Sequence, residues 1–361
     1  MSGNDERFMA RALQLALSAP FTSPNPRVGA VVVVAGRIVG EGAHRGRGTP
    51  HAEMVALANA GSPPGATVYV TLEPCSHHGR TPPCAPALVR AGVRRVVVAL
   101  VDPDPRVSGR GIAALRAAGV DVTVGVGARA AALANAPYLH QRSTGRSYLS
   151  LKLAQSMDGR TAAADGSSRW ITGPGARRRV HERRARADAV MVGAGTVLVD
   201  DPQLTARSVG AARQPARVVV DGAGRVPSSA RVFASGGRVL VATTENCPHD
   251  VQVGWKEAGA EVVTLPSAPE GVALPALLER LGAEGFLEVV CEGGARLATS
   301  LLRDDLVDRV ELHLGPVLLG GAGGALGDLG VATMGDSARW RTTRVERVGD
   351  DVVWELHRSG A

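Results

Sequence analysis

The sequence is poor in aromatic residues, in cysteine and in long apolar runs. Aromatic side chains make up only 3% of the 361 residues, so the stacking platforms used by proteins that bind single-stranded nucleic acid are scarce. Four cysteines in a chain of this length do not make a disulfide scaffold. No apolar run approaches the length of a membrane span, and the N-terminus lacks the apolar segment of a secretory signal. We therefore expect a cytoplasmic protein without a membrane partner.

The length and the residue pattern predict two α/β domains. A chain of 361 residues is long enough for two domains of ordinary size, each with its own core. The apolar content of 45% is arranged in Val, Ala and Leu runs that Gly and Pro interrupt, which is typical of alternating strands and helices. A helix is expected over residues 128–140 and a polar linker over 141–146. The expected domains are residues 1–145 and 146–361.

Three short motifs in the first half carry one imidazole, two thiols and one carboxylate. They are His51-Ala52-Glu53, Pro74-Cys75 and the later Cys84. Two thiolates and a histidine can hold zinc and leave its fourth position to water, whose pKa the metal lowers. In nucleobase deaminases a glutamate two residues after the histidine, not itself a ligand, transfers the proton. The alternative is that the two cysteines are core residues and His51 is a surface histidine.

The surrounding pattern fits a zinc site inside a layered α/β domain. A helix is expected to begin at His51 and to end at Gly61, and a second helix to begin at Cys84. Helix N-termini favour anions, so nearby cysteines are easier to hold as thiolates. The other expected elements are an opening helix over 5–19, strands over 28–34, 37–42, 67–72, 93–101 and 120–126, and a helix over 112–118. This order predicts a three-layer α/β/α domain with mixed strands.

The segment that joins the two cysteines is longer than in most deaminases. Eight residues separate Cys75 from Cys84, where the general deaminase signature has two. The segment PCSHHGRTPPC at residues 74–84, with PNPRVG at residues 24–29, closely resembles the deaminase half of the RibD family, bifunctional enzymes of riboflavin biosynthesis. The resemblance implies a cytidine-deaminase-like domain with one Zn²⁺. Its substrate would be 2,5-diamino-6-ribosylamino-4(3H)-pyrimidinone 5′-phosphate, whose ribosyl group the second half would then reduce to ribityl with NADPH.

The expected site residues of the first domain follow from the motif and the resemblance together. Asn25, held between two prolines, is well placed to read a pyrimidine edge with its amide, although a turn asparagine is the plain alternative. His77, His78 and Arg80 lie beside the zinc loop. One histidine offers an alternative metal ligand, but a substrate contact or a place on the loop surface suits both better, and we favour His77 as a substrate contact. The expected zinc ligands are His51, Cys75 and Cys84, and the expected catalytic residue is Glu53.

The second half contains segments that suit a nucleotide cofactor. A strand over 147–154 carries Lys152 at its expected end. A buried strand over 286–292 breaks at Gly293-Gly294 into a helix over 295–302, whose N-terminus offers free N–H groups to a pyrophosphate. The segment Gly193-Ala194-Gly195-Thr196 is expected to form a second loop of close approach. Neither segment is a full G-x-G-x-x-G fingerprint.

These segments are similar to the reductase half of the same family, which resembles dihydrofolate reductase in fold. The similarity implies cofactor contacts at Ala154, Trp170, Thr196, Asp200, Gly222, Gly294 and Ala295. It implies substrate contacts at Ser168, Arg184, Leu204, Arg207 and Glu292. Either Arg184 or Arg207 is expected to grip the substrate phosphate, because a guanidinium binds phosphate through two hydrogen bonds. Lys152 or Asp200 is expected to assist protonation, and the sequence leaves that choice open.

The net charge of +7 keeps a second function class open. A basic surface attracts polyanions, and some zinc deaminases act on nucleic acid, so a nucleic-acid deaminase with an appended domain is the alternative. The excess is mostly scattered arginine, which a phosphorylated substrate and NADPH also use, so we expect no nucleic-acid partner. A protein with an inactive reductase half is a third possibility. The expected closing strands over 307–314 and 342–357 offer edges for pairing, which suggests a homodimer.

Overall fold

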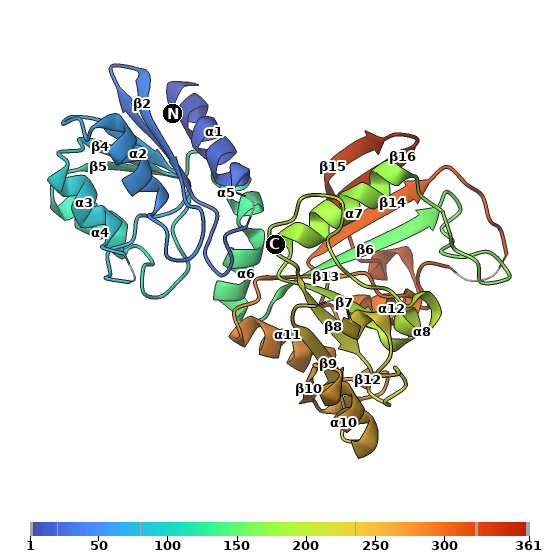
Figure 1. Ribbon diagram of the computed structural model, residues 1–361. Helices are drawn as coiled ribbons and strands as arrows, with labels where there is room; N and C mark the ends of the chain where they lie inside the picture. Colours follow the sequence, from blue (N-terminus) through green and yellow to red (C-terminus); the bar gives the residue numbers. More distant parts are fainter. Residues whose placement is uncertain (1–2, 20, 80, 235, 322–323, 359–361) are drawn as a thin grey trace. The chain divides into compact units, whose positions relative to one another are not determined.

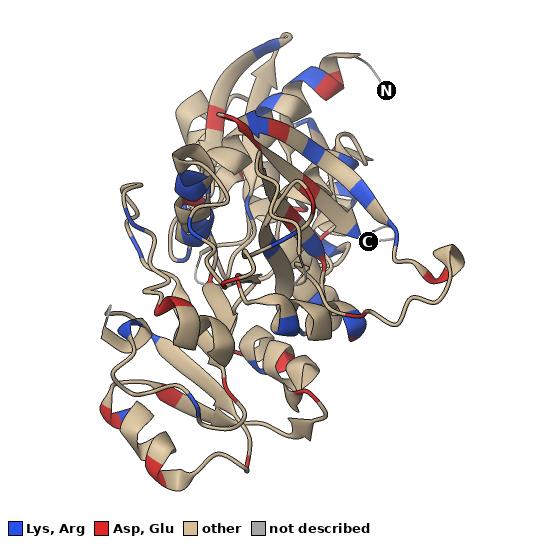
Figure 2. Cartoon of the chain, turned by 90° about the vertical axis from the view of Figure 1, so that its right-hand side faces the viewer, with Lys and Arg blue, Asp and Glu red and all other residues tan. Residues whose placement is uncertain are grey.

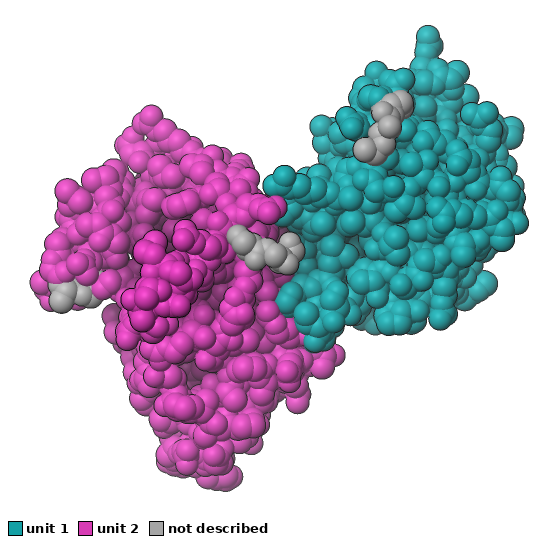
Figure 3. All heavy atoms as spheres, turned by 180° about the vertical axis from the view of Figure 1, so that it is seen from behind, with its two compact units in different colours: residues 1–145 teal, residues 146–361 magenta. Residues whose placement is uncertain are grey.

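The chain folds into two compact units. The computed structural model describes residues 3–19, 21–79, 81–234, 236–321 and 324–358. Unit 1 is Met1–Gly145 and unit 2 is Arg146–Ala361 (Figure 3). The expected boundary lies at the same residue. In the described residues, no helix combines the length and the apolar character needed to cross a membrane.

Unit 1 is built on a mixed five-stranded sheet. Its strands are β1 (Gly29–Val34), β2 (Arg37–Ala43), β3 (Thr67–Val70), β4 (Arg95–Val98) and β5 (Asp121–Val124). Their order is β2-β1-β3-β4-β5. β1 runs antiparallel to both of its neighbours, and β3, β4 and β5 run parallel to one another.

Helices cover both faces of this sheet (Figure 1). They are α1 (Gly3–Ser18), α2 (Ala52–Ala60), α3 (Cys84–Arg90), α4 (Arg110–Ala117), α5 (Ala128–Ala134) and α6 (Ala136–Thr144). Alternate residues of β1 enter different cores, as the period of a strand requires. Val31 and Val33 pack in the core with α1 and α5, whereas Ala30 and Val32 pack with α2, α3 and α4. The expected three-layer arrangement with mixed strands is confirmed.

Helix α2 lies directly on the backbone of β2. A Cβ at Gly42 would lie 2.3 Å from the Ala52 carbonyl oxygen, and one at Gly40 would lie 2.2 Å from that of Ala56. Only glycine at these two positions lets the helix approach so closely. The contact fixes the first turn of α2, where the sequence places His51 and Glu53, against the sheet.

The end of unit 1 differs from the expectation. The single helix predicted over 128–140 is wrong, because the chain forms α5 and α6 with a break at Asn135. The Asn135 side chain accepts a hydrogen bond from the Arg27 backbone N–H at 2.8 Å and donates one to the Arg27 carbonyl at 2.9 Å. Pro137 then stands in the first turn of α6, where it is tolerated. Because α6 continues to Thr144, most of the predicted linker is helical.

Unit 2 is built on a nine-stranded sheet with the order β10-β9-β8-β7-β13-β6-β14-β16-β15. These strands are β6 (Tyr148–Ser156), β7 (Ala189–Gly193), β8 (Ala216–Val220), β9 (Val239–Thr243), β10 (Glu261–Thr264), β13 (Glu288–Cys291), β14 (Arg309–Gly315), β15 (Trp340–Val348) and β16 (Asp351–Arg358). The strands from β10 to β14 in this order run parallel, and β16 and β15 close the sheet antiparallel. A separate hairpin joins β11 (Ser267–Ala268) to β12 (Gly271–Val272).

The helices of unit 2 bury two apolar cores and one ionic face. They are α7 (Pro174–Arg186), α8 (Ala194–Asp200), α9 (Arg231–Ala234), α10 (His249–Glu257), α11 (Leu274–Ala283) and α12 (Ala295–Arg303), with a short 3₁₀ turn at Met334–Asp336. Leu149 and Leu151 of β6 pack in one core with α11 and α12. Val190 and Val192 of β7 pack in another with α10. Arginines of α7 pair with acidic residues of β13, β14, β15 and β16, so this helix covers an ionic part of the sheet (Figure 1).

Two local predictions in unit 2 are wrong. Lys152 lies in the middle of β6 rather than at its end, because the strand continues to Ser156. The segment 193–196 is not a loop: β7 ends at Gly193 and α8 begins at Ala194. The residues that were expected to approach a ligand from a loop therefore lie at a helix N-terminus.

Candidate functional site

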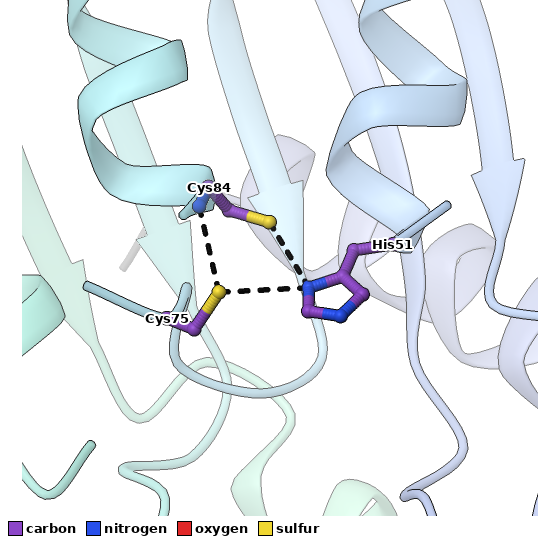
Figure 4. Close-up of side chains that lie close together, drawn as sticks. All are labelled: His51, Cys75 and Cys84. Atoms are coloured by element: carbon purple, nitrogen blue, oxygen red, sulfur yellow. Dashed lines mark hydrogen bonds between the residues drawn. The ribbon is translucent and has the colours of Figure 1, made fainter. Parts of the chain in front are cut away.

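Three elements of unit 1 bring His51, Cys75 and Cys84 together. His51 is the N-cap of α2, Cys75 follows β3, and Cys84 is the first residue of α3. One ligand atom of each lies within 4.8 Å of the others. The His51 Nδ1 atom is 3.2 Å from the Cys84 Sγ and 3.6 Å from the Cys75 Sγ, with both sulfur atoms turned toward the ring (Figure 4).

This donor set fits a zinc ion. Zinc binds cysteine sulfur at about 2.3 Å and histidine nitrogen at about 2.0 Å, and a tetrahedral arrangement then separates N from S by about 3.5 Å. The two N–S distances of 3.2 and 3.6 Å lie on either side of that value. Three protein ligands leave one coordination position for water or substrate, as in catalytic zinc sites. The predicted ligand trio therefore has the geometry of a catalytic centre.

Neighbouring groups hold the trio in place. Thr81 Oγ1 lies 3.2 Å from the His51 Nε2, the ring nitrogen that faces away from the sulfur atoms. The Cys84 backbone N–H, at the start of α3, donates to the Cys75 Sγ at 3.4 Å. Hydrogen bonds from Cys84 and from His51 lower the pKa of the Cys75 thiol, which favours the thiolate. Sequence reasoning missed Thr81, although partners of this kind orient most metal-binding histidines.

Glu53 lies in the first turn of α2 beside the trio. Its side chain is only 3% exposed, and it lines the same cavity as His51 and Cys75. Burial raises the pKa of Glu53 to about 7. A carboxyl group with such a pKa can both take and release a proton near neutral pH.

The cavity beside the trio has a volume of about 160 Å³ and reaches Asn25 and His77. The Asn25 Nδ2 atom lies 2.8 Å from His44 Nε2, and the other ring nitrogen of His44 lies 3.1 Å from the Pro50 carbonyl oxygen. Burial lowers the pKa of His44, so the neutral ring can donate to Pro50 and accept from the Asn25 amide. The hydrogen bond to His44 therefore fixes the orientation of the Asn25 amide. Sequence reasoning missed His44, which belongs to no motif.

Acidic and basic side chains also line this cavity. Asp102, Asp104, Arg106, Tyr138 and Arg142 line it. The Tyr138 hydroxyl donates to both oxygens of Asp102, at 3.0 and 3.1 Å. The Arg106 guanidinium lowers the pKa of Asp104 to about 2, which keeps that carboxylate ionised. None of these residues carried a signal in the sequence strong enough to select it.

The histidines of the zinc loop separate into two environments. His77 is half-buried and lines the cavity, and within the described residues its Nδ1 has no hydrogen-bond partner. His78 is exposed and is absent from the cavity lining. Arg80 lies outside the described residues. The structure therefore places His77, rather than His78, where a substrate contact was expected.

A second cavity, of about 590 Å³, lies in unit 2. It opens beside β6, β7 and β13, the central parallel strands, whose carboxyl ends share one edge of the sheet. The predicted residues that line it are Lys152, Ala154, Ser168, Trp170, Arg184, Thr196, Asp200, Leu204, Arg207, Glu292, Gly294 and Ala295. Gly222 does not line this cavity: it follows β8 and packs near Thr244 and Val272.

Two helix N-termini meet at one side of this cavity. α8 begins at Ala194 and α12 begins at Ala295, and both helices carry cavity-lining residues. The Gly294 N–H donates to Thr196 Oγ1 at 2.9 Å, which joins the two starts. Helix N-termini offer N–H groups and a positive dipole to phosphate groups. Trp170, 67% exposed, adds an accessible aromatic face in the same cavity, with the Arg177 guanidinium 4.3 Å from its ring.

Arg184 and Glu292 form an ion pair in the cavity wall. Arg184 donates to both carboxylate oxygens of Glu292, at 2.8 and 2.7 Å, and to the Thr205 carbonyl at 3.1 Å. Burial pushes the pKa of Glu292 upward, but Arg184 and the Lys152 ammonium outweigh it and hold the pKa below its ordinary value. The Arg207 guanidinium instead donates only to neutral oxygens of Gln203 and Thr205 among the described residues. Of the two arginines expected to bind the substrate phosphate, Arg207 is the one that no described carboxylate engages.

Lys152 and Asp200 differ in their surroundings. Lys152 is half-buried, and its ammonium makes no hydrogen bond among the described residues. Burial lowers the pKa of Lys152, and the carboxylates of Glu292 and Glu311 oppose that effect. Asp200 ends α8, with its Oδ1 3.9 Å from the Arg169 guanidinium and its side chain 41% exposed. Lys152 is thus the more enclosed of the two groups that face the cavity.

Comparisons with known proteins agree on one family. The family described as "RibD C-terminal domain" matches residues 147–354, and the "Cytidine and deoxycytidylate deaminase zinc-binding region" matches residues 2–100. The riboflavin biosynthesis protein RibD of Aquifex aeolicus is 42% identical over 97% of both chains. A structure of Acinetobacter baumannii RibD covers 99% of both chains with a TM-score of 0.88 and 38% identity.

The third relative is a solved structure from Thermotoga maritima with a TM-score of 0.84, 34% identity and 99% coverage of both chains. It is described as a diaminohydroxyphosphoribosylaminopyrimidine deaminase and 5-amino-6-(5-phosphoribosylamino)uracil reductase. These comparisons and the two sheets confirm the predicted fold class. The chain is α/β, with a three-layer cytidine-deaminase-like domain followed by a dihydrofolate-reductase-like domain.

Proposed function

This chain belongs to the RibD family of bifunctional riboflavin-biosynthesis enzymes, and on that premise we propose that residues 1–145 are its zinc-dependent pyrimidine deaminase and residues 146–361 its NADPH-dependent reductase. The family combines a hydrolase with an oxidoreductase in one chain. The observation that carries the proposal is the separation of the two sites. The zinc-type trio lies wholly in unit 1, and the large cavity with two helix N-termini lies wholly in unit 2.

The deaminase reaction replaces the 2-amino group of the pyrimidine by oxygen. Zinc, when held by His51, Cys75 and Cys84, supplies Lewis acidity that makes hydroxide available near neutral pH. Glu53 takes a proton from the attacking water and passes it to the amino group, which leaves as ammonia. The pKa of about 7 suits this carboxyl group to both halves of the transfer.

Asn25 and His77 are the proposed contacts with the substrate of unit 1. Because the Asn25 Nδ2 is held by His44, the amide presents its Oδ1 as the remaining acceptor for a donor on the pyrimidine. His77 lines the same cavity, and its Nδ1 has no hydrogen-bond partner in the part of the chain that the structure describes. Together these two residues orient the ring so that C2 lies beside the trio.

The reductase reaction saturates the bond between C1′ of the opened sugar and its nitrogen. NADPH, when bound, supplies the hydride to C1′. We assign the accompanying proton, which goes to the nitrogen, to Lys152 rather than to Asp200. Lys152 is the more enclosed group, and no hydrogen bond within the described residues engages its ammonium. Two carboxylates beside it favour the protonated form that a donor requires.

The remaining lining residues divide between the two ligands of unit 2. Gly294, Ala295 and Thr196, at the two helix N-termini, suit the cofactor phosphates, and Trp170 with Ala154 and Asp200 completes that side. Gly222, which does not line the cavity, has no structural support for its predicted cofactor contact. Arg207 is the residue that we propose binds the substrate phosphate. The other proposed substrate contacts are Ser168, Leu204, Arg184 and Glu292.

The competing nucleic-acid reading has little physical support. Figure 2 shows basic and acidic residues interspersed along the described part of the chain, and arginines of α7 pair with carboxylates of the sheet and of the cavity wall. A chain with a silent reductase half is disfavoured because the predicted reductase residues, apart from Gly222, line one cavity.

We also propose that the enzyme is a cytoplasmic homodimer. The edge strand β15 pairs only with β16 in the described sheet, and Val345 on it is 61% exposed. An exposed edge of this length can pair with another copy of itself. Light scattering of the purified chain measures the oligomeric state directly, and a monomer at working concentration would contradict this part of the proposal.

The assignment of the two sites is tested by a pair of matched substitutions. Glu53→Gln is expected to keep bound zinc, measured by elemental analysis, and to lose deamination while it still reduces the deaminated pyrimidine with NADPH. Lys152→Met is expected to keep zinc and deamination and to lose reduction of the deaminated pyrimidine. Deamination that survives in Glu53→Gln would refute the proposed proton carrier. Loss of deamination in Lys152→Met would contradict the separation of the sites.

A further inference from the structure

A row of ionisable side chains crosses the sheet of unit 2 beneath α7. Lys152 of β6 is the register partner of Glu311 on β14, and Glu311 is in turn the partner of Glu355 on β16. On the other side of β6, Cys291 pairs with Leu151, so the next residue, Glu292, is level with Lys152. Residues in register on neighbouring strands point to the same face. Lys152 therefore stands between the carboxylates of Glu292 and Glu311.

The two carboxylates beside Lys152 differ in function. Glu292 lines the cavity and is bound through both oxygens by Arg184, so its charge is largely balanced there. Glu311 does not line the cavity; it is 4% exposed and lies beside Lys152 on the neighbouring strand. A residue in that position touches neither substrate nor cofactor, and its influence on the reaction passes through Lys152.

Buried partners hold Glu311 in place. His313, two residues later on β14 and fully buried, has its Nε2 2.6 Å from Glu311 Oε1. The Arg183 Nε on α7 is 3.8 Å from Glu311 Oε2, and the same guanidinium also pairs with Glu288. Because Arg183 is shared between two carboxylates, it does not neutralise Glu311 alone. Burial raises the pKa of Glu311, but His313 and Arg183 outweigh it and hold that pKa below its ordinary value, so Glu311 stays a carboxylate on the strand next to Lys152.

We propose that Glu311 is a positioning residue for the reduction: from the neighbouring strand its carboxylate keeps the Lys152 ammonium charged beside the substrate sugar. The proposal rests on the function proposed above for Lys152. The charged groups that face Lys152 are Glu292 after β13, Arg184 on α7 and Glu311 on β14. Burial and Arg184 lower the pKa of Lys152, and Glu292 and Glu311 oppose them. Because Glu292 is itself bound to Arg184, Glu311 is the carboxylate beside Lys152 that Arg184 does not engage.

The composition of the chain makes this proposal directly measurable. Lys152 and Lys256 are the only two lysines, and Lys256 is an exposed residue of α10. The pH dependence of amine acylation of the full chain, followed by mass spectrometry of its proteolytic peptides so that the two lysines are separated, therefore yields the titration midpoint of Lys152 with Lys256 as an internal reference. The pH profile of reduction is recorded on the same protein, and deamination by unit 1 reports that the chain is intact.

The test compares Glu311→Gln with Glu355→Gln, which removes a half-buried carboxylate of the same row one strand farther from Lys152. Glu311→Gln is expected to lower the Lys152 midpoint by about one pH unit or more, the usual effect of a close opposite charge. As the pH rises, reduction should then be lost at a pH that is lower by the same amount. Deamination and the Lys256 midpoint should stay unchanged. Glu355→Gln should leave the Lys152 midpoint within a few tenths of a unit.

An unchanged Lys152 midpoint in Glu311→Gln, or an equal shift in Glu355→Gln, would overturn the proposal. Glu311→Asp keeps the negative charge but moves it away by one methylene group. It is therefore expected to lower the Lys152 midpoint by less than Glu311→Gln does. That variant decides the question if Glu311→Gln does not fold. Full reduction by Lys152→Met would instead refute the role given to Lys152, and it would do so even if the midpoint shifts as expected. The two failures are therefore distinguishable.

Discussion

The ion pair between Arg184 and Glu292 allows a quantitative prediction. Its side chains are only 11% and 9% exposed, and two hydrogen bonds of 2.8 and 2.7 Å join them. Glu292→Ala leaves the Arg184 guanidinium with the Thr205 carbonyl as its remaining described partner. Removal of one member of a buried pair costs about 3–5 kcal/mol, because the other charge stays buried without compensation. For a unit of roughly 200 residues, this corresponds to a fall in Tm of about 6–20 °C.

Tryptophan fluorescence is a suitable assay because all four tryptophans lie in unit 2. Thermal and urea unfolding followed at this signal should show the loss in Glu292→Ala, while deamination at 25 °C is retained. The matched control is the double variant Arg184→Met with Glu292→Met, which removes both charges and keeps most of the volume. It should recover most of the lost stability, since no unpaired charge remains. A loss below about 1 kcal/mol in the single variant, or a larger loss in the double variant, would refute the reasoning.

Three further substitutions test other parts of the two sites. Cys75→Ala should abolish stoichiometric zinc binding and deamination, measured by elemental analysis and ammonia release, and should leave reduction intact; a zinc-loaded variant would contradict the ligand set. Gly111→Ala places a Cβ 1.8 Å from the Pro74 carbonyl oxygen, so the backbone before Cys75 must shift. We expect about 1–3 kcal/mol of destabilisation and a reduced deamination rate, and an unchanged rate would argue against a rigid zinc loop. Arg207→Ala should raise KM of the phosphorylated substrate in reduction by roughly 10–100-fold, with little effect on a dephosphorylated analogue; equal effects on both would exclude a phosphate contact.

The zinc-type trio was predictable because its signal is local. His51 and Glu53 belong to one helix start, and Cys84 begins another, so short motifs fix their placement relative to the backbone. What the motifs do not contain is the set of groups that orient the trio. Thr81 and His44 act through contacts that depend on how the loops close around the site. Such contacts follow from tertiary structure and leave no periodic pattern in the sequence.

Long-range contacts also explain the local predictions that failed. The Ala-rich run after residue 128 reads as one helix, but the Asn135 side chain binds the backbone of Arg27, 108 positions earlier, and the helix breaks there. Lys152 looked like the end of a strand because polar residues follow it. In the structure, β14 pairs with β6 through Ser156 and extends the strand past the lysine. Propensity therefore identified the elements, and tertiary pairing determined where they end.

One chain carrying two separate activities in a fixed order is the central proposal for this enzyme. The most direct measurement is to incubate the zinc-loaded protein with the diaminopyrimidine ribosylamino phosphate, with and without NADPH, and to identify the products by mass. Without NADPH we expect only the exchange of an amino group for oxygen, and with NADPH the further gain of two hydrogens. Deamination without any reduction would contradict the function assigned to unit 2, and an unchanged substrate in both incubations would contradict the account as a whole.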